Sequence, residues 1–258
     1  MDKLSALIFD VDGTLADTER DGHRIAFNRA FDEAGLDWFW GEDRYGDLLR
    51  VTGGKERIRL YISEDWPDLL EAADIDERIR ALHAAKTRHY LSLLETGAIP
   101  LRPGVRRLLL EARAAGLRLA IATTTTPDNV TTLLRATLGE EGVAWFEVIA
   151  AGDIVPAKKP ASDIFDVALS ELGLSPTACL ALEDSENGLR AALGAGVPTV
   201  VTTNGYTRGQ DFTGAIAVLD GLGEPDAPVT VQAGTAPVSG YVDVDSLMAW
   251  HRRAQSSG

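Results

Sequence analysis

Five short apolar runs, most of them followed by a helical pattern, constrain the fold of this chain more than any other feature. They lie at residues 6–9, 117–122, 148–151, 179–182 and 197–201. Short apolar runs that alternate with helices are typical of parallel strands buried on both faces. The alternation predicts an α/β fold whose core is a Rossmann-like parallel sheet.

The gap between the first two runs is too long for a single crossover helix. Between residues 75 and 93, isoleucines and leucines recur at helical spacing, whereas strand-like alternation is scarce throughout the gap. We therefore expect an inserted α-helical domain at residues 16–99 and a core domain formed by residues 1–15 and 100–258. The segment 97–104, with two prolines, marks the return to the core.

Composition narrows the possible partners. The net charge of −14 repels nucleic acid and anionic membranes, so neither is expected to bind. Charged residues interrupt every apolar stretch well before the ~20 residues of a membrane helix, and the start does not resemble a signal peptide. A cytoplasmic protein is expected, with a monomer as the working assumption. The single cysteine, Cys179, lies in an apolar run, which favours a buried structural thiol.

The first apolar run ends in Asp10-Val11-Asp12-Gly13-Thr14. Alternate residues of a strand point the same way, so Asp10 and Asp12 can both project from the carboxyl edge of the sheet, where ligands of open α/β sheets bind. An EF-hand loop is disfavoured because Gly13 is fourth rather than sixth and a strand precedes the motif. A polar turn with Asp12-Gly13 at its corner remains the alternative.

A threonine cluster follows the second run. Thr126 precedes Pro127 and is expected to be the N-cap of a helix. Thr123 and Thr124 remain candidates for binding the oxygens of an anion.

Two charged clusters complete the set of residues at strand ends. Lys159 precedes a helical pattern, and a solvated pair with Lys158 is the alternative to a site residue. Glu183 and Asp184 end the fourth run. Helix capping by Asp184 or Ser185 is the alternative there, although capping does not explain two adjacent carboxylates at the end of a buried strand.

These four ordered pieces resemble the motifs of the haloacid dehalogenase superfamily of phosphatases and phosphomutases, and the helical insertion resembles its cap domain. The resemblance implies that Asp10 is the nucleophile, that Asp12 is the general acid and base, and that Thr123 and Lys159 bind the phosphoryl group. It also implies a Mg²⁺ cofactor. Its ligands would be Asp10, Asp12 through its backbone carbonyl, Glu183 and Asp184.

Longer stretches, including Asp37-Trp38-Phe39-Trp40 and Thr52 to Arg57, resemble the CbbY family. That family converts xylulose 1,5-bisphosphate, an inhibitor of Rubisco in the Calvin cycle, to xylulose 5-phosphate. The resemblance implies a small sugar bisphosphate as substrate. Candidate substrate-binding residues are Asp17, His23, Arg50, Lys55 and Lys86.

Interpretations without a role in substrate binding remain open for three of these residues. The Gly53-Gly54-Lys55 segment can be a flexible turn, Lys86 can extend to water from an apolar stripe, and His23 can be an ordinary surface residue. Two other functions also remain open: a β-phosphoglucomutase-like phosphosugar mutase, since the same core residues serve transfer and hydrolysis, and a non-catalytic sensor of phosphorylated metabolites.

Overall fold

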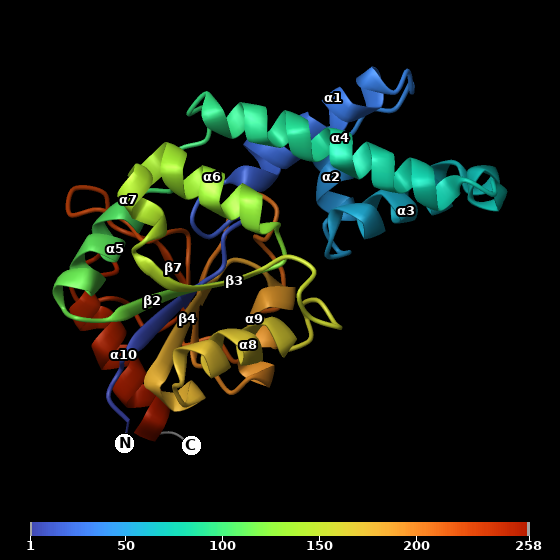
Figure 1. The fold of residues 1–258 in the computed structure, drawn as a ribbon. Helices are drawn as coiled ribbons and strands as arrows, with labels where there is room; N and C mark the ends of the chain where they lie inside the picture. The colour runs from blue at the N-terminus through green and yellow to red at the C-terminus, as the bar shows by residue number, and fades with distance from the viewer. Residues whose placement is uncertain (1, 257–258) are drawn as a thin grey trace. The chain divides into compact units, whose positions relative to one another are not determined.

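The protein is described by a computed structural model that covers residues 2–256 and divides into two compact units (Figure 1). The larger unit contains the residues up to Asp17 and those from Pro100 onwards, and the helical unit is Thr18–Ile99. The first boundary falls after Asp17 rather than after residue 15. The reason is that Ala16 forms a β-bridge with Leu101, and Asp17 pairs with Arg102.

The larger unit is built on a seven-stranded sheet in the order β3-β2-β1-β4-β5-β6-β7. Neighbouring strands are parallel except β6 and β7, which are antiparallel. The predicted α/β fold is confirmed, because each of the five apolar runs overlaps one of the strands β1 to β5. The strands are β1 (Ala6–Phe9), β2 (Arg118–Thr123), β3 (Phe146–Ala151), β4 (Cys179–Glu183), β5 (Thr199–Thr202), β6 (Ala217–Leu219) and β7 (Val231–Gly234).

The strand order reverses direction between β1 and β4. From β1 the chain adds β2 and then β3 on one side, and from β4 it adds β5 and β6 on the other side. Phe9 of β1 lies opposite Leu182 of β4, so the two strands end next to each other. Ligands of open α/β sheets bind outside the carboxyl ends of the strands at such a reversal.

Two strands were not predicted. None of the five apolar runs covers the edge strand β7 or its antiparallel partner β6. β7 is exposed along its whole length and therefore carries no apolar run, and β6 is only 3 residues long.

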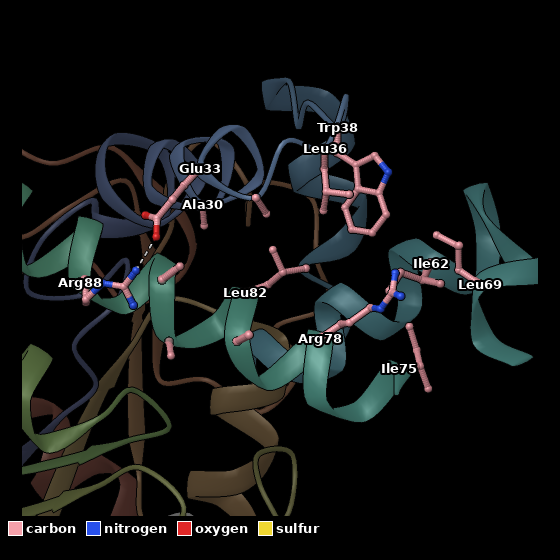
Figure 2. Close-up of a pocket in the computed structure, with 14 residues that line it drawn as sticks. Ala30, Glu33, Leu36, Trp38, Ile62, Leu69, Ile75, Arg78, Leu82 and Arg88 are labelled. Carbon is pink, nitrogen blue, oxygen red and sulfur yellow. Dashed lines mark hydrogen bonds and ion pairs between the residues drawn. The ribbon is translucent and has the colours of Figure 1, made fainter. Parts of the chain in front are cut away.

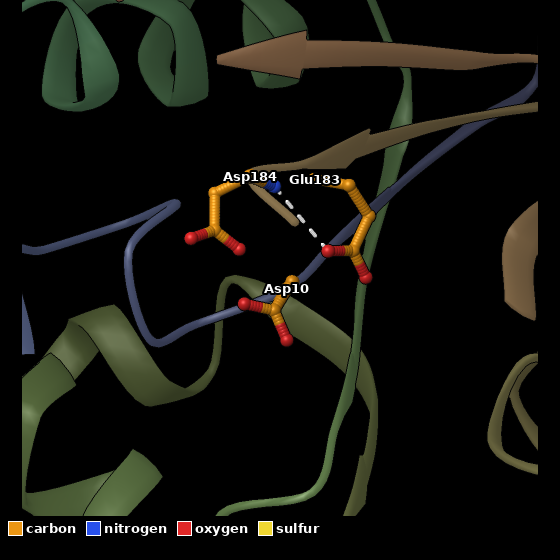
Figure 3. A group of neighbouring side chains, drawn as sticks. All are labelled: Asp10, Glu183 and Asp184. Atoms are coloured by element: carbon orange, nitrogen blue, oxygen red, sulfur yellow. Dashed lines mark hydrogen bonds between the residues drawn. The ribbon is translucent and has the colours of Figure 1, made fainter. Parts of the chain in front are cut away.

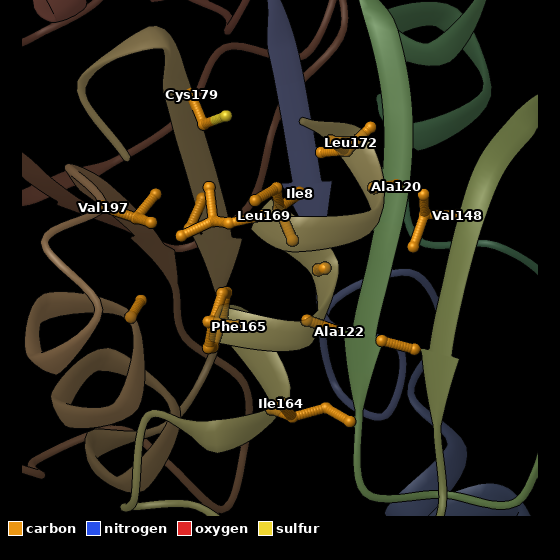
Figure 4. Packing of buried hydrophobic residues seen from close by; sticks show 14 of the residues in the cluster. Ile8, Ala120, Ala122, Val148, Ile164, Phe165, Leu169, Leu172, Cys179 and Val197 are labelled. Carbon is orange, nitrogen blue, oxygen red and sulfur yellow. The ribbon is translucent and has the colours of Figure 1, made fainter. Parts of the chain in front are cut away.

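Helices cover the sheet and bury its apolar side chains (Figure 4). Phe165 and Leu169 of one helix pack against a surface that includes the small residues Ala120 and Ala122 of β2. Cys179 lies in the same cluster as a free thiol, which confirms its predicted burial, and burial raises its pKa to about 11. The helices of this unit are α5 (Val105–Ala114), α6 (Pro127–Leu138), α7 (Glu140–Val143), α8 (Asp163–Leu172), η3 (Pro176–Ala178), α9 (Glu186–Gly194) and α10 (Val244–Ser256).

The helical unit has an aromatic core. Phe31 packs edge-on against Trp40 with ring centroids 4.9 Å apart, and Trp40 packs in the same way against Tyr61 at 5.4 Å. No helix within residues 2–256 combines the length and apolar character that crossing a membrane requires. The elements of this unit are η1 (Glu19–His23), α1 (Arg24–Glu33), α2 (Glu42–Leu48), α3 (Gly54–Asp65), η2 (Pro67–Glu71) and α4 (Ile75–Glu95).

An apolar pocket of about 530 Å³ lies beside α1 and α4 within the helical unit (Figure 2). Leu36, Trp38 and Ile62 are among the side chains that line it. Glu33 and Arg88 pair with each other at 2.6 Å in its lining. The pocket is therefore a largely apolar hollow whose charges are already compensated.

Candidate active site

The ends of β1 and β4 bring three carboxylates together (Figure 3). Asp10 directly follows β1, and its backbone N–H donates to the Leu182 carbonyl of β4 at 3.0 Å. Glu183 is the last residue of β4, and Asp184 follows it. One oxygen from each of Asp10, Glu183 and Asp184 lies within 4.8 Å of the others, and all three side chains are buried.

Lys159 bridges two of these carboxylates. Its Nζ donates to Asp10 Oδ1 at 2.7 Å, to Glu183 Oε1 at 2.6 Å and to the Ala122 carbonyl at 2.9 Å. These three bonds use every donor of an ammonium group. Burial opposes the charge on Lys159, but the two carboxylates outweigh that effect and raise its pKa above the usual value.

The carboxylates themselves are held in an unfavourable setting for negative charge. Burial raises the pKa of Asp10 and Asp184, and it raises the pKa of Glu183 to about 7 although Lys159 acts in the opposite direction. The cluster contains three buried carboxyl groups and one ammonium group. When the carboxyl groups are ionised, negative charge is in excess. A hard divalent cation takes oxygen ligands of this kind, and the donor set therefore fits Mg²⁺.

Two glycines make room for the carboxylates. Gly13 has a φ of +89°, and a Cβ on it would lie 2.2 Å from Asp184 Oδ2. A Cβ on Gly188, in the first turn of α9, would lie only 1.9 Å from Glu183 Oε2. Real Cβ atoms do not approach oxygen so closely, so both positions depend on the absence of a side chain.

Asn204 also touches the cluster and was not predicted from the sequence. Its Nδ2 donates to Asp184 Oδ2 at 2.7 Å. It lies just beyond β5, which is the neighbour of β4. The rule that singled out the other residues, a polar side chain after a buried strand, would also have indicated Asn204.

The structure places the threonine cluster at the end of β2 and the start of α6. Thr123 is the buried last residue of β2, and its Oγ1 accepts from the Thr125 N–H at 3.4 Å, whereas Thr124 is half-buried. Thr126 accepts from the Asn129 N–H at 3.4 Å, which confirms the predicted N-cap.

Asp12 and Asp17 lie in the segment that follows β1. Asp12 is half-buried, forms a β-bridge with Ala16, and belongs to the loop rather than to the cluster of three carboxylates. Asp17 Oδ1 lies 3.4 Å from Arg102 Nε. Arg102 was not predicted as a site neighbour, although it also donates to the carbonyl of Gly13.

Two of the four candidates in the helical unit are grouped with Tyr90. The ring of His23 packs on that of Tyr90 with centroids 3.9 Å apart, and Lys86 Nζ lies 5.1 Å from the centre of the same ring. Both His23 and Lys86 are buried, contrary to the alternatives of a surface histidine and a lysine reaching water.

The other two candidates are Arg50 and Lys55. Arg50 is exposed and forms an ion pair with Glu64 of α3. Lys55, near the start of α3, lines a pocket of about 640 Å³ together with Arg59 and Arg80.

The chain is similar in sequence to known proteins. A family model described as haloacid dehalogenase-like hydrolase matches residues 4–196. The plasmid-encoded protein CbbY of Cupriavidus necator is 48% identical over 248 residues, which is 96% of this chain and 97% of the relative.

Two proteins with solved structures are similar to this chain, one in sequence and fold and one in fold alone. CbbY from Rhodobacter sphaeroides is 46% identical with a TM-score of 0.76, covering 84% of this chain and 94% of its own, and has been solved with phosphate and, as a mutant, with xylulose-(1,5)bisphosphate. A β-phosphoglucomutase from Clostridium difficile covers 98% of this chain and 99% of its own with a TM-score of 0.73; at 19% identity it shows a shared fold alone.

Proposed function

Because the chain belongs to the haloacid dehalogenase-like hydrolase family, we propose that it is a Mg²⁺-dependent phosphatase of a small sugar bisphosphate. The reaction we propose is the conversion of xylulose 1,5-bisphosphate to xylulose 5-phosphate. The observation that carries this proposal is the meeting of Asp10, Lys159, Glu183 and Asp184 where the strand order reverses.

In the proposed reaction, Asp10 is the nucleophile. A carboxylate oxygen of Asp10 attacks phosphorus, the bond to the sugar oxygen breaks, and an aspartyl phosphate forms. Asp12 protonates the departing sugar oxygen and then accepts a proton from the water that hydrolyses the aspartyl phosphate. Thr123 holds a phosphoryl oxygen, and Lys159 would turn a donor that now goes to a carboxylate towards the phosphoryl group when substrate binds. Lys159 also offsets the charge of Asp10.

Asp10, Glu183 and Asp184 would hold the cation, with the Asp12 backbone carbonyl as a further ligand. A bound Mg²⁺ would neutralise charge on the phosphoryl group and on the carboxylates around it. The fit rests on the excess of buried carboxylates over ammonium groups in the cluster.

The similarity to CbbY supports the choice of substrate. A mutant of the Rhodobacter sphaeroides protein has been solved in complex with xylulose-(1,5)bisphosphate, and that protein is similar to this chain over most of both sequences. A second phosphate needs a second cationic site, and Lys55, His23 and Lys86 of the helical unit are the residues we propose for it. The proposal includes the cytoplasmic location that we expect from the sequence.

The test is phosphate release from xylulose 1,5-bisphosphate in the presence of Mg²⁺, compared between the unmodified protein and Asp10→Asn. We expect turnover that chelation by EDTA abolishes and that the variant lacks. Turnover by Asp10→Asn at the unmodified rate would refute the assigned nucleophile, and full activity in EDTA would refute the assigned metal.

A panel of phosphorylated sugars separates the remaining functions. Formation of glucose 6-phosphate from β-glucose 1-phosphate without free phosphate would show a mutase instead. A folded protein that binds phosphorylated sugars but turns none of them over would show a sensor.

A further inference from the structure

Asn204 occupies a place in the site that the proposed reaction does not use. We propose that Asn204 is a positioning residue that fixes the Asp184 carboxylate for a divalent cation. This inference rests on the proposed function, because it concerns the metal ligand Asp184.

The orientation of the Asn204 amide is determined by its two bonds. Its Oδ1 accepts from the Tyr206 N–H at 2.9 Å, and its Nδ2 donates to Asp184 Oδ2 at 2.7 Å. A flipped amide would bring two donors together at Tyr206 and two acceptors together at Asp184. The amide group therefore faces Asp184 as a donor.

The loop that carries Asn204 is itself held in place. The Asn204 N–H donates to Thr207 Oγ1 at 3.0 Å. The guanidinium of Arg102 donates to the Thr203 carbonyl at 2.6 Å and to the Thr202 carbonyl at 3.1 Å. Asn204 is thus anchored on both sides, as a group that orients another residue must be.

Asp184 needs such a partner because Lys159 cannot serve it. The three donors of Lys159 go to Asp10, Glu183 and the Ala122 carbonyl. A neutral amide restrains the Asp184 carboxylate without cancelling its charge, which leaves that charge available to a cation. Gly13 permits the arrangement, since a Cβ there would lie 2.6 Å from Asn204 Nδ2.

Partners that orient metal ligands typically contribute 10- to 100-fold to metal affinity. The experiment titrates the protein with Mn²⁺ in the absence of substrate and follows free Mn²⁺ by electron paramagnetic resonance. Asn204→Ala removes both side-chain bonds. Asn204→Ser keeps an oxygen that can accept from the Tyr206 N–H, as serine does in turns, but it is too short to reach Asp184.

Asn28→Ala is the matched control. Asn28 also makes two hydrogen bonds, both to the backbone of Trp40, but it lies in the helical unit. We expect the Mn²⁺ dissociation constant to rise about 10- to 100-fold in both Asn204 variants and to stay unchanged in Asn28→Ala. Saturating Mg²⁺ should restore most of kcat in Asn204→Ser, while its activation constant for Mg²⁺ shifts by the same factor.

Two results would overturn different claims. If Asn204→Ser is folded by circular dichroism and binds Mn²⁺ as tightly as the unmodified protein, Asn204 does not position Asp184. If the unmodified protein binds no Mn²⁺, or Asp184→Asn binds it equally well, the metal site of the proposed function is wrong.

Discussion

At the scale of single residues, the position of the Glu183 side chain requires a glycine at position 188. Alanine normally stabilises a helix relative to glycine by about 1 kcal/mol. At Gly188, however, the added Cβ would lie 1.9 Å from Glu183 Oε2. We expect Gly188→Ala to lower the free energy of unfolding by about 1–3 kcal/mol, as overpacking does, and to reduce phosphatase activity at least tenfold. Urea denaturation and phosphate release measure the two effects.

Gly194 at the other end of α9 is the matched control. A Cβ there would meet only the Cβ of Ser162, at an ordinary distance of 3.5 Å. Gly194→Ala should leave both quantities unchanged or raise stability slightly. If Gly188→Ala and Gly194→Ala have the same stability and phosphatase activity, the position of Glu183 does not depend on the missing side chain at Gly188.

The residues of the carboxylate cluster were predictable, but some of their neighbours were not. Asp10, Glu183 and Asp184 could be singled out because parallel strands end at a common edge, and the structure brings the three together. A glycine is required at position 188 because α9 lies close to the Glu183 side chain of β4. No local sequence pattern encodes that distance. The substrate-binding role of Arg50 stays a prediction, and no local pattern encodes its ion pair with Glu64 of α3.

At the scale of elements, Arg102 ties several segments of the larger unit together. Its guanidinium donates to the carbonyls of Gly13, Thr202, Thr203 and Asp220. Loss of that group leaves several carbonyls without their donor, and each buried unsatisfied group costs about 1–3 kcal/mol. We expect Arg102→Met to lower the free energy of unfolding by about 3 kcal/mol in urea denaturation.

Arg106 on the adjoining helix α5 provides the comparison. It is exposed, and the hydrogen bond from its side chain to the Thr137 carbonyl is long at 3.5 Å. Arg106→Met should change stability by no more than about 0.5 kcal/mol. A similarly small change in Arg102→Met would show that the loops keep their conformation without the guanidinium.

Within the helical unit, Lys86 offers a test of substrate binding. Its Nζ lies 5.2 Å from the ring centre of Phe27 and 5.1 Å from that of Tyr90, in a buried position on α4. If Lys86 contacts the second phosphate, Lys86→Met removes a charge-assisted hydrogen bond to the substrate. The loss of such a bond should raise KM for xylulose 1,5-bisphosphate at least tenfold. The KM for a monophosphate ester should change little.

Arg78 is a cation on the same helix and serves as the control. It is exposed and pairs with Asp74 four residues earlier. Arg78→Met should leave both KM values unchanged. An equal rise for the two substrates in Lys86→Met would indicate a packing role for Lys86.

The elements themselves were predictable to different degrees. Strands buried on both faces gave clear apolar runs, which is why β1 to β5 could be predicted. The exposed strand β7 has no apolar run, so the sequence pattern does not identify it as a strand. The structure shows it as one because it pairs antiparallel with β6.

At the scale of the whole molecule, burial of the carboxylates should make stability depend on pH. Burial raises the pKa of Glu183 from 4.5 to about 7, and the pKa of Asp10 and Asp184 is raised as well. A group with a raised pKa contributes stability that is complete below its unfolded pKa and is lost as pH rises through its folded pKa. Surface carboxylates such as Glu64 and Glu147 have lowered pKa values, so they titrate below this range.

We therefore expect the melting temperature of the chelator-treated protein to fall as pH rises from about 5 to about 7.5. The fall should be smaller in Glu183→Gln, because glutamine stays neutral across that range, although Asp10 and Asp184 still contribute. Mg²⁺ favours the ionised carboxylates and should flatten the curve of the unmodified protein but change that of Asp184→Asn less. Differential scanning calorimetry with and without chelator measures these curves. Metal-free curves that are flat, or that coincide for the unmodified protein and Glu183→Gln, would contradict the excess negative charge on which the proposed metal site depends.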